Sequence, residues 1–314
     1  MSTMASPSIE VRGLVAGYPG HDPALRAVDL AAGRGLLVLL GPTGAGKTTL
    51  LRVLAGQVPP RAGTVSVDGA DAAAAPLSAR GHIGYVPQEI GLPHELTLYE
   101  YLSELLAIDG VRRDVRGDRA RAAAGQVHLR GDLHRRLRRF SGGMRRRALI
   151  AQALLRQPRV WLLDEPTAGL DPVERLTVLA LLRELGEDAC VVVASHLTSD
   201  VAALPGRVAV LDGGRLVWTG PTGAFVGVAA GHVWEVDGAA APEGPGWLAQ
   251  PAQSPGRLRI VGSDGTPPSG DGTRPAEPTV DDAYFATLLR ARAAATAAAA
   301  DAEPLGRRAE GRAR

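Results

Sequence analysis

A glycine-rich run with one lysine is the stretch of this sequence whose residue types and spacing most clearly could do chemistry. It covers residues 41–49 and consists of Gly41, Pro42, Thr43, Gly44, Ala45, Gly46, Lys47, Thr48 and Thr49. The spacing Gly-x-x-x-x-Gly-Lys-Thr is typical of a phosphate-binding loop. In such a loop backbone N–H groups hold phosphate oxygens, the lysine reaches the β and γ oxygens, and the threonine hydroxyl binds Mg²⁺. We expect these nine residues to bind the phosphates of a nucleotide.

The lysine at position 47 stands out against the composition, because 34 of the 35 lysine and arginine residues are arginine. An ammonium is a compact point charge that fits inside a closed backbone loop, whereas a guanidinium is a wide planar fork. The alternative is a glycine-rich turn with an exposed lysine. The flanking pattern favours the phosphate loop, since the apolar run 35–40 predicts a buried strand and the pattern at 47–55 predicts a helix that ends at Gly56.

Two adjacent carboxylates form a second group. Asp164 and Glu165 come directly after the apolar run 161–163, which is typical of a buried strand. Carboxylates at the end of a strand can hold a Mg²⁺ shell and orient an attacking water. Alone this pattern is weak, but together with the phosphate loop it predicts hydrolysis of a nucleotide phosphate.

A serine and two glycines form a third group within the run 140–144. Ser141, Gly142 and Gly143 stand where a helical pattern begins. Backbone N–H groups at a helix start can bind an anion, and glycines leave them accessible. In isolation an ordinary capped helix is the simpler interpretation, so this run gains its meaning from the other two groups.

The bulk composition bounds the class of protein. A length of 314 residues predicts about two domains, and the 45% hydrophobic content is enough for a core. The single cysteine, Cys190, excludes an internal disulfide and fits a reducing compartment, with burial in a strand as its expected place. Residues 1–8 show no secretory start, and glycines interrupt the uncharged stretch 216–234, so we expect no membrane span.

Strand and helix patterns alternate along most of the chain, which predicts a parallel sheet wrapped by helices. Strands are expected at 9–14, 28–30, 36–40, 63–69, 83–86, 160–163, 191–194, 207–212 and 215–219, and helices at 47–55, 96–108, 141–155 and from Asp171 onward. Asp171, Pro172 and Glu174 together give a strong helix start. From about Gly231 the pattern changes to short strands at 232–236 and 257–261, and Thr279 is expected to cap a helix that runs to about residue 295.

Over roughly residues 8–225 these groups and their order resemble the ATP-binding cassette (ABC) ATPases. The resemblance assigns Tyr18 to adenine stacking, Gln88 to the Q-loop, residues 141–144 to the signature, Asp164 and Glu165 to Walker B, residues 168–171 to the D-loop and His196 to the switch histidine. Each residue alone has a plainer interpretation: Tyr18 as a surface turn aromatic, Gln88 as a polar loop residue, His196 as a core histidine. The order of six motifs argues for function.

The resemblance implies an α/β fold with a P-loop NTPase core, an antiparallel β subdomain and a helical subdomain. The expected ABC ATPase domain covers residues 8–228, with its helical subdomain at about 89–155. A small α+β C-terminal domain is expected at 229–295, followed by a disordered basic tail at 296–314.

The family also implies a mechanism in which two cassettes pack head to tail around two ATP molecules, and a homodimer is sufficient because one chain carries every part. Lys47 would hold the phosphates, Thr48, Gln88 and Asp164 would arrange Mg²⁺, Glu165 would act as general base and His196 would sense the γ-phosphate. Ser141 and Gly143 would complete the site from the opposite subunit.

The signature departs from the family's commonest form, since Phe140 and Met144 replace leucine and glutamine. This form, and the segment 278–284, resemble the subgroup that drives type-two ABC exporters. The resemblance implies an exporter subunit at the cytoplasmic face of the membrane that energises a separate permease, which segment 89–139 would contact.

One alternative is a soluble ABC-type ATPase acting on ribosome or nucleic acid, although such proteins typically carry two cassettes. The other is a P-loop kinase or GTPase, which the signature and the switch histidine argue against.

A basic block lies between Arg112 and Arg147, with thirteen arginines against three aspartates. It fits a solvated helical face, or a surface that lies beneath an anionic membrane leaflet. Nucleic-acid binding is not expected, because no aromatic residues are interleaved with the arginines.

We predict that Lys47→Arg weakens ATP binding by about tenfold or more, because the planar guanidinium does not fit the loop and its charge-assisted hydrogen bonds are lost. Equilibrium titration with a fluorescent ATP analogue measures the effect, and an unchanged thermal unfolding midpoint serves as the control for folding. Wild-type affinity in the variant would remove the special role of lysine.

Overall fold

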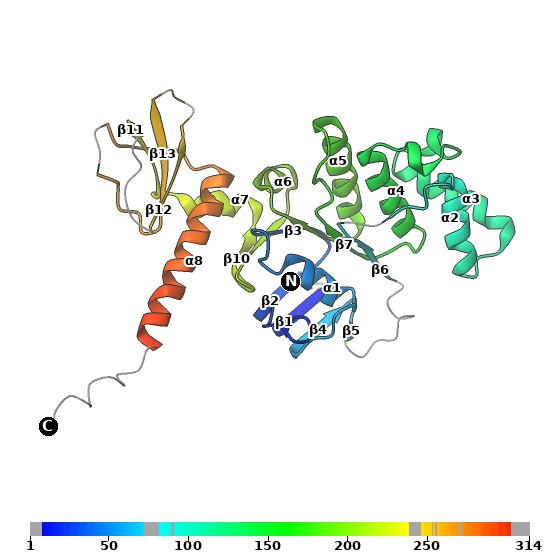
Figure 1. Ribbon diagram of the computed structural model, residues 1–314, viewed down its shortest axis with the longest axis horizontal. Helices are drawn as coiled ribbons and strands as arrows, with labels where there is room; N and C mark the ends of the chain where they lie inside the picture. The colour runs from blue at the N-terminus through cyan, green and yellow to red at the C-terminus, as the bar shows by residue number, and fades with distance from the viewer. Residues whose placement is uncertain are drawn as a thin grey trace, which may run out of the picture. The chain divides into compact units, whose positions relative to one another are not determined.

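The protein was analysed as a computed structural model that describes residues 8–71, 82–88, 91–238, 246–252, 254, 256–269 and 272–302, with side chains up to residue 298 (Figure 1). The chain divides into two compact units, Met1–Thr222 and Gly223–Arg314. This division falls after residue 222, whereas the sequence placed a domain boundary after residue 228. The two units are described separately below.

A six-stranded sheet forms the centre of the first unit, with the strand order β10-β9-β3-β8-β7-β6. The strands are β3 (Gly35–Leu40), β6 (Ile83–Val86), β7 (Val160–Asp164), β8 (Cys190–Ser195), β9 (Arg207–Asp212) and β10 (Arg215–Pro221). All neighbours pair in parallel except β10, which forms an antiparallel hairpin with β9. Every residue of β7 and β8 is buried, as expected for continuous apolar runs covered on both faces.

A second, antiparallel sheet has the order β2-β1-β4-β5 and comprises β1 (Ile9–Ala16), β2 (Leu25–Ala32), β4 (Ala62–Val67) and β5 (Ala70–Asp71). Helix α1 (Lys47–Leu54) carries Leu50, Leu51 and Leu54 into one apolar core that includes residues of both sheets. The predicted α/β fold with an antiparallel β part is confirmed. Packing of α1 against both sheets fixes the start of this helix, where the phosphate loop ends.

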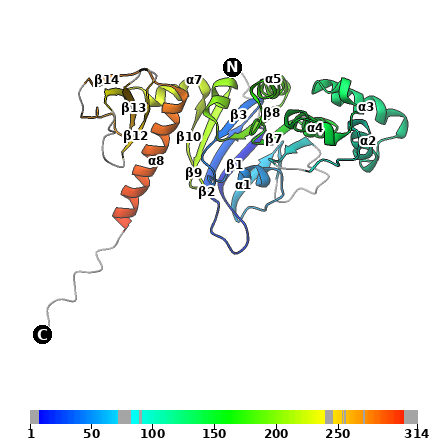
Figure 2. The ribbon, with the colours of Figure 1, turned by 45° about the horizontal axis from the view of Figure 1, so that its top comes forward.

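A helical region follows β6 and consists of α2 (Leu98–Ile108), α3 (Arg113–Gln126), the short 3₁₀ turns η2 (Arg130–Asp132) and η3 (Leu137–Arg139), and α4 (Gly142–Leu154). Both views show α2 and α3 at the far edge of the first unit, beside α4 (Figures 1 and 2). Thr97 begins α2 with a capping box that pairs it with Glu100. Helices α5 (Pro172–Asp188) and α6 (Thr198–Ala203) follow β7 and β8.

The basic block is used largely inside the fold. Ten of its thirteen arginines bond to a carboxylate or a backbone carbonyl: Arg112, Arg116, Arg119, Arg121, Arg135, Arg136, Arg138, Arg145, Arg146 and Arg147. The guanidinium groups of Arg113, Arg130 and Arg139 have no hydrogen-bond or ion-pair partner within the described part of the chain. Most arginines of the block therefore make contacts within the chain, while some of their side chains stay exposed, 82% for Arg112.

Helix α7 (Thr222–Phe225) begins at the last residue of the first unit. The second unit contains the rest of α7, the 3₁₀ turn η4 (Val226–Ala229) and a sheet of order β12-β13-β11-β14. Its strands are β11 (Val233–Asp237), β12 (Trp247–Pro251), β13 (Arg257–Gly262) and β14 (Arg274–Pro275), and α8 (Val280–Ala302) packs against β13 and η4 (Figure 2). Arg259 of β13 is paired with the fully buried Asp282 of α8 at 2.6 Å. Thr279 caps α8 through Asp282, as the sequence predicted.

Two features of the second unit differ from the sequence-based expectation. Strand β12 was not predicted, because only tertiary contact, including the edge-on packing of Trp247 on Trp234, orders this segment. The alanine-rich end of α8 continues to Ala302, where the sequence placed the start of a disordered tail at residue 296, and alanine has the highest helix propensity. The rest of the predicted tail, residues 303–314, lies outside the described residues.

Within the described residues, no helix has the length and apolar character needed to cross a membrane.

Cys190 begins β8 in the middle of the large sheet and is 1% exposed. Burial raises the pKa of its thiol to about 12, and only the thiolate is a nucleophile. We predict that the native protein does not react with an aromatic disulfide reagent at pH 8. After unfolding in guanidinium, one thiol per chain should react, since an exposed cysteine has a pKa of about 8.5. Absorbance of the released thiolate measures this, and stoichiometric reaction of the native protein would contradict the buried position.

Candidate functional site

The phosphate loop connects β3 to α1 and has the backbone that its glycines permit. Gly44 and Gly46 have φ values of 83° and 103°, in the left-handed region that favours glycine. A Cβ atom at Gly46 would lie 2.8 Å from the carbonyl oxygen of Ala24, so a larger residue would push the loop off β2. The loop therefore places its N–H groups and the start of α1 around one cavity.

This cavity has a volume of about 380 Å³. It is lined by Ala24, Thr43, Gly44, Ala45, Gly46, Lys47, Thr48, Thr49, Gln88, Glu165 and His196. The structure thus brings together most of the loop with the predicted Q-loop, Walker B and switch residues. Gly41 and Pro42 stand behind it and contact Lys47 through their carbonyl oxygens.

Lys47 is 7% exposed and folds back over the loop. Its Nζ donates to the carbonyl oxygens of Gly41 at 2.7 Å and Pro42 at 3.2 Å. It also lies 3.7 Å from Oε1 of Glu165. Burial lowers the pKa of Lys47, while the charges of Glu165 and Asp164 act against this shift. A buried cation at the start of a helix, beside a glycine-rich loop, is an arrangement that fits a polyphosphate.

Glu165 stands between the lysine and the histidine. Its Oε2 lies 2.8 Å from Nδ1 of His196, whose side chain is 47% exposed. Its backbone has φ +48°, a left-handed conformation uncommon for glutamate, and its N–H donates to the carbonyl of Ala194. Such strained backbone persists only where the surrounding contacts hold it, often at functional sites. The carboxylate therefore faces the cavity because the backbone is held in this conformation.

Asp164 is 1% exposed, and its Oδ1 has no hydrogen-bond partner within the described part of the chain. Buried polar atoms are usually satisfied, so a single free carboxylate oxygen fits a cation or an ordered water. The described residues contain no cluster of three His, Cys, Asp or Glu side chains that could hold a metal ion by themselves. Mg²⁺ is commonly bound through one or two carboxylates, with phosphate and water completing its shell; the carboxylate of Asp164, with the side-chain oxygens of Thr48 and Gln88, fits that mode.

Tyr18 does not line this cavity. Its hydroxyl accepts a hydrogen bond from Arg52 at 2.7 Å, its carbonyl accepts one from Arg61, and the residue is 38% exposed. Two arginines therefore hold the predicted adenine-stacking residue in place at the surface.

The signature residues also lie outside the phosphate-loop cavity. Ser141 caps α4, accepting from the N–H of Met144 and donating to Oε1 of Glu174 at 2.8 Å. Gly142 lines a separate cavity of about 670 Å³ with Gln88, Arg145, Arg146 and the D-loop residues 168–170. Gly143 packs against Glu174, where a Cβ atom would clash with the carboxylate. Within one chain the signature and the phosphate loop are thus two separate surfaces.

Sequence reasoning missed a buried polar network behind His196. Asp200 is fully buried and accepts hydrogen bonds from Thr167 at 2.7 Å, Ser195 at 2.6 Å and Arg175 at 2.5 Å. It ties the segment after Glu165 to the segment before His196 and to α5. No local pattern marks these residues, because their partners are far apart in the sequence.

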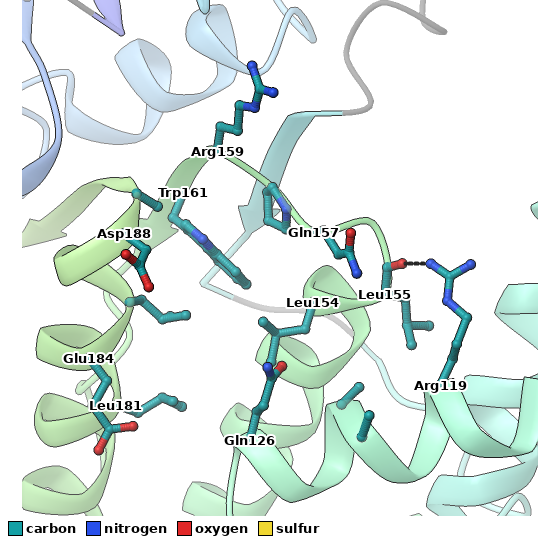
Figure 3. A pocket seen from close by; sticks show the side chains of 15 residues that line it. Arg119, Gln126, Leu154, Leu155, Gln157, Arg159, Trp161, Leu181, Glu184 and Asp188 are labelled. Carbon is teal, nitrogen blue, oxygen red and sulfur yellow. Dashed lines mark hydrogen bonds between the residues drawn. The ribbon is translucent and has the colours of Figure 1, made fainter.

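Another cavity, of about 550 Å³, lies between α3, the end of α4, the start of β7 and α5, with Trp161 on its wall (Figure 3). None of the predicted site residues lines it. Arg119 reaches across from α3 to donate to the carbonyl oxygen of Leu155. This contact holds α3 to the end of α4 and has no link to the phosphate loop.

Comparison with known proteins was consistent with this geometry. Residues 26–168 match the family described as ABC transporter. The chain is similar to the daunorubicin resistance ATP-binding protein DrrA3 of Streptomyces coeruleorubidus, with 37% identity over 223 residues that cover 69% of each chain. It is 34% identical to the lipopolysaccharide export system ATP-binding protein LptB of Escherichia coli (strain K12), over 67% of this chain and 89% of LptB. It is 40% identical to the molybdate/tungstate import ATP-binding protein WtpC of Archaeoglobus fulgidus, over 62% of this chain and 80% of WtpC.

Solved structures show the same fold. An ATP-binding subunit of an ABC transporter superposes with a TM-score of 0.60 at 27% identity, covering 69% of this chain and 91% of that one. A dimeric ATP-binding cassette in a post-hydrolysis state with ADP and Pi gives a TM-score of 0.61 at 24% identity, covering 68% and 98%. Because the likeness to DrrA3 extends over more than two thirds of the chain and the family match contains both the phosphate loop and Glu165, this chain belongs to the ATP-binding subunits of ABC transporters and is an ATPase of that family.

Proposed function

We propose that this chain is the nucleotide-binding subunit of an ABC exporter, which hydrolyses ATP to drive a separate membrane permease. The observation that carries the catalytic part is the position of Glu165, whose carboxylate lies between Lys47 and His196 beside the phosphate loop. Export rests on the resemblance of the signature run 140–144 and of segment 278–284 to the type-two exporter subgroup. The names of the relatives point both ways, to export for LptB and to import for WtpC.

In the proposed reaction the chain's own residues position the phosphates and move one proton. Lys47 and the loop N–H groups bind the phosphate oxygens, and Thr48, Gln88 and Asp164 hold Mg²⁺, which when bound neutralises charge on those oxygens. Glu165 accepts a proton from the attacking water. His196 fixes the orientation of that carboxylate through the 2.8 Å contact at Nδ1, which leaves Nε2 to face the γ-phosphate.

Two chains are needed for a complete site in this proposal. Within one chain neither Ser141 nor Gly142 lines the phosphate-loop cavity, so a second cassette would supply them. A homodimer is sufficient, because the same chain carries both surfaces. The fold likeness to a dimeric cassette supports this arrangement.

The permease contact is proposed for the helical region. Ile108 at the end of α2 is 80% exposed, and it adjoins a cavity of about 200 Å³ that is also lined by Tyr85, Leu105 and Gln152. Burial of this side chain against a partner would remove apolar surface from water, which favours association. The chain would thereby be held at the cytoplasmic face of the membrane.

Direct contact with an anionic leaflet would rest on Arg113, Arg130 and Arg139. Nucleic-acid binding is not proposed.

We predict that Glu165→Gln binds ATP and forms the dimer but loses hydrolysis, by about 100-fold or more, because the amide cannot accept the water proton. Phosphate release measures turnover, and size-exclusion chromatography with ATP and Mg²⁺ measures the dimer. Turnover at the wild-type rate would remove Glu165 from the role of base.

We also predict that the chain co-purifies in detergent with a polytopic membrane protein from its host, and that Ile108→Asp reduces this recovery several-fold because a charge cannot enter an apolar contact. Leu248→Asp, at a residue 41% exposed in the second unit, serves as the matched control and should leave recovery unchanged. Mass spectrometry identifies the partner. Recovery of ribosomal proteins or nucleic acid in place of a membrane protein would favour the soluble ATPase alternative.

A further inference from the structure

Arg146 on α4 is a buried guanidinium that binds backbone carbonyls of two other segments. Its side chain is 8% exposed. Nη1 donates to the carbonyl oxygen of Pro87 at 2.9 Å, and Nη2 donates to those of Gln88 and Glu165, both at 3.1 Å. One side chain thus joins the helix that begins at the signature to the Q-loop and to the catalytic glutamate.

The chemistry of these contacts favours arginine. A guanidinium presents several N–H donors in one rigid plane, so it can hold three oxygens at fixed positions, whereas an ammonium is a single point. Removing a cation from water is costly unless its donors are satisfied. Burial lowers the pKa of Arg146, and the charges of Asp164 and Glu165 act against this shift. The three carbonyl oxygens and the two carboxylates therefore stabilise the charged form of Arg146 in its buried position.

The contact with Glu165 acts on the strained residue of the site. The N–H of Glu165 donates to the carbonyl of Ala194, its side chain contacts His196, and its carbonyl oxygen accepts from Arg146 and from the N–H of Ala168. With φ at +48°, Glu165 has a backbone conformation that persists only where surrounding contacts hold it. Among the side chains of the described residues, Arg146 is the donor to its carbonyl oxygen.

We propose that Arg146 is a positioning residue for ATP hydrolysis. Its guanidinium keeps the backbone of Glu165 in the conformation that directs the carboxylate to the attacking water. It also holds the Q-loop at a fixed position against α4. Any movement of the signature helix is thereby transmitted to the catalytic base of the same chain. This inference rests on the proposed role of Glu165 and adds a residue that does not touch the nucleotide.

The test compares Arg146→Met, which removes all three hydrogen bonds while retaining similar bulk, with Arg146→Lys, which retains the charge. Arg119→Met is the matched control, because Arg119 also donates from a partly buried position to one carbonyl, that of Leu155, far from the phosphate loop. For Arg146→Met we expect kcat to fall about 10- to 100-fold, since small misplacements of a catalytic group cost that much. KM and the affinity for ATP should stay within about twofold, which separates positioning from binding. Arg146→Lys should recover part of kcat.

Hydrogen exchange of the folded proteins gives a readout that does not depend on activity. Amides in segments 83–88 and 163–168 should exchange faster in Arg146→Met than in wild type, while the rest of the first unit and the Arg119→Met control should be unchanged. If kcat and exchange in both segments match wild type, the positioning role is wrong although Glu165 keeps its own. If exchange rises throughout the first unit and Arg146→Lys recovers nothing, Arg146 is a structural residue only. If wild type itself hydrolyses no ATP, this inference fails together with the proposed function.

Discussion

Three parallel strands end side by side in the large sheet, and the segment beyond each end carries one charged or titratable residue of the site. In the pairing of β3 with β8, Leu40 stands opposite Ser195, and in the pairing of β7 with β8, Asp164 stands opposite Ala194. Because the register brings the three ends level, Lys47, Glu165 and His196 meet at one edge. A shift of one residue in either pairing would reverse the faces of a strand and separate these groups, so the catalytic arrangement depends on the packing of fully buried strands.

Buried and partly buried arginines form a second organising feature. In the helical region Arg116, Arg119 and Arg147 donate to backbone carbonyls between 5 and 36 residues away, as Arg146 does toward Gln88 and Glu165. Helix and turn carbonyls left without a partner are costly when buried. The arginine-rich composition is therefore used here for hydrogen bonding within the chain, which explains how a block with thirteen arginines and three aspartates can be part of a packed subdomain.

The start of α5 shows how the signature is supported within one chain. Asp171 caps α5 as expected, accepting from the N–H groups of Val173 and Glu174. The side chain of Glu174 accepts hydrogen bonds from Ser141 and Arg147 instead of completing a capping box. This contact holds the signature serine against α5. For Ser141 to donate to a phosphate of a second cassette, its hydroxyl has to leave Glu174, so the signature surface and the start of α5 are coupled.

The sequence determined the phosphate loop, the two carboxylates, the caps of α4 and α5 and most strands, because each depends on residue types at short spacing. It also pointed to Gln88 and His196 through their order along the chain, and both line the phosphate-loop cavity. It could not reveal Arg146, Asp200, strand β12 or the contact between Ser141 and Glu174. Each of these is set by partners between 5 and 59 residues away, or by a neighbouring strand, in contacts such as those from Arg146 to Pro87 and from Ser195 to Asp200. Local spacing fixes what a segment can bind, whereas the close packing of separate segments decides which donor meets which carbonyl.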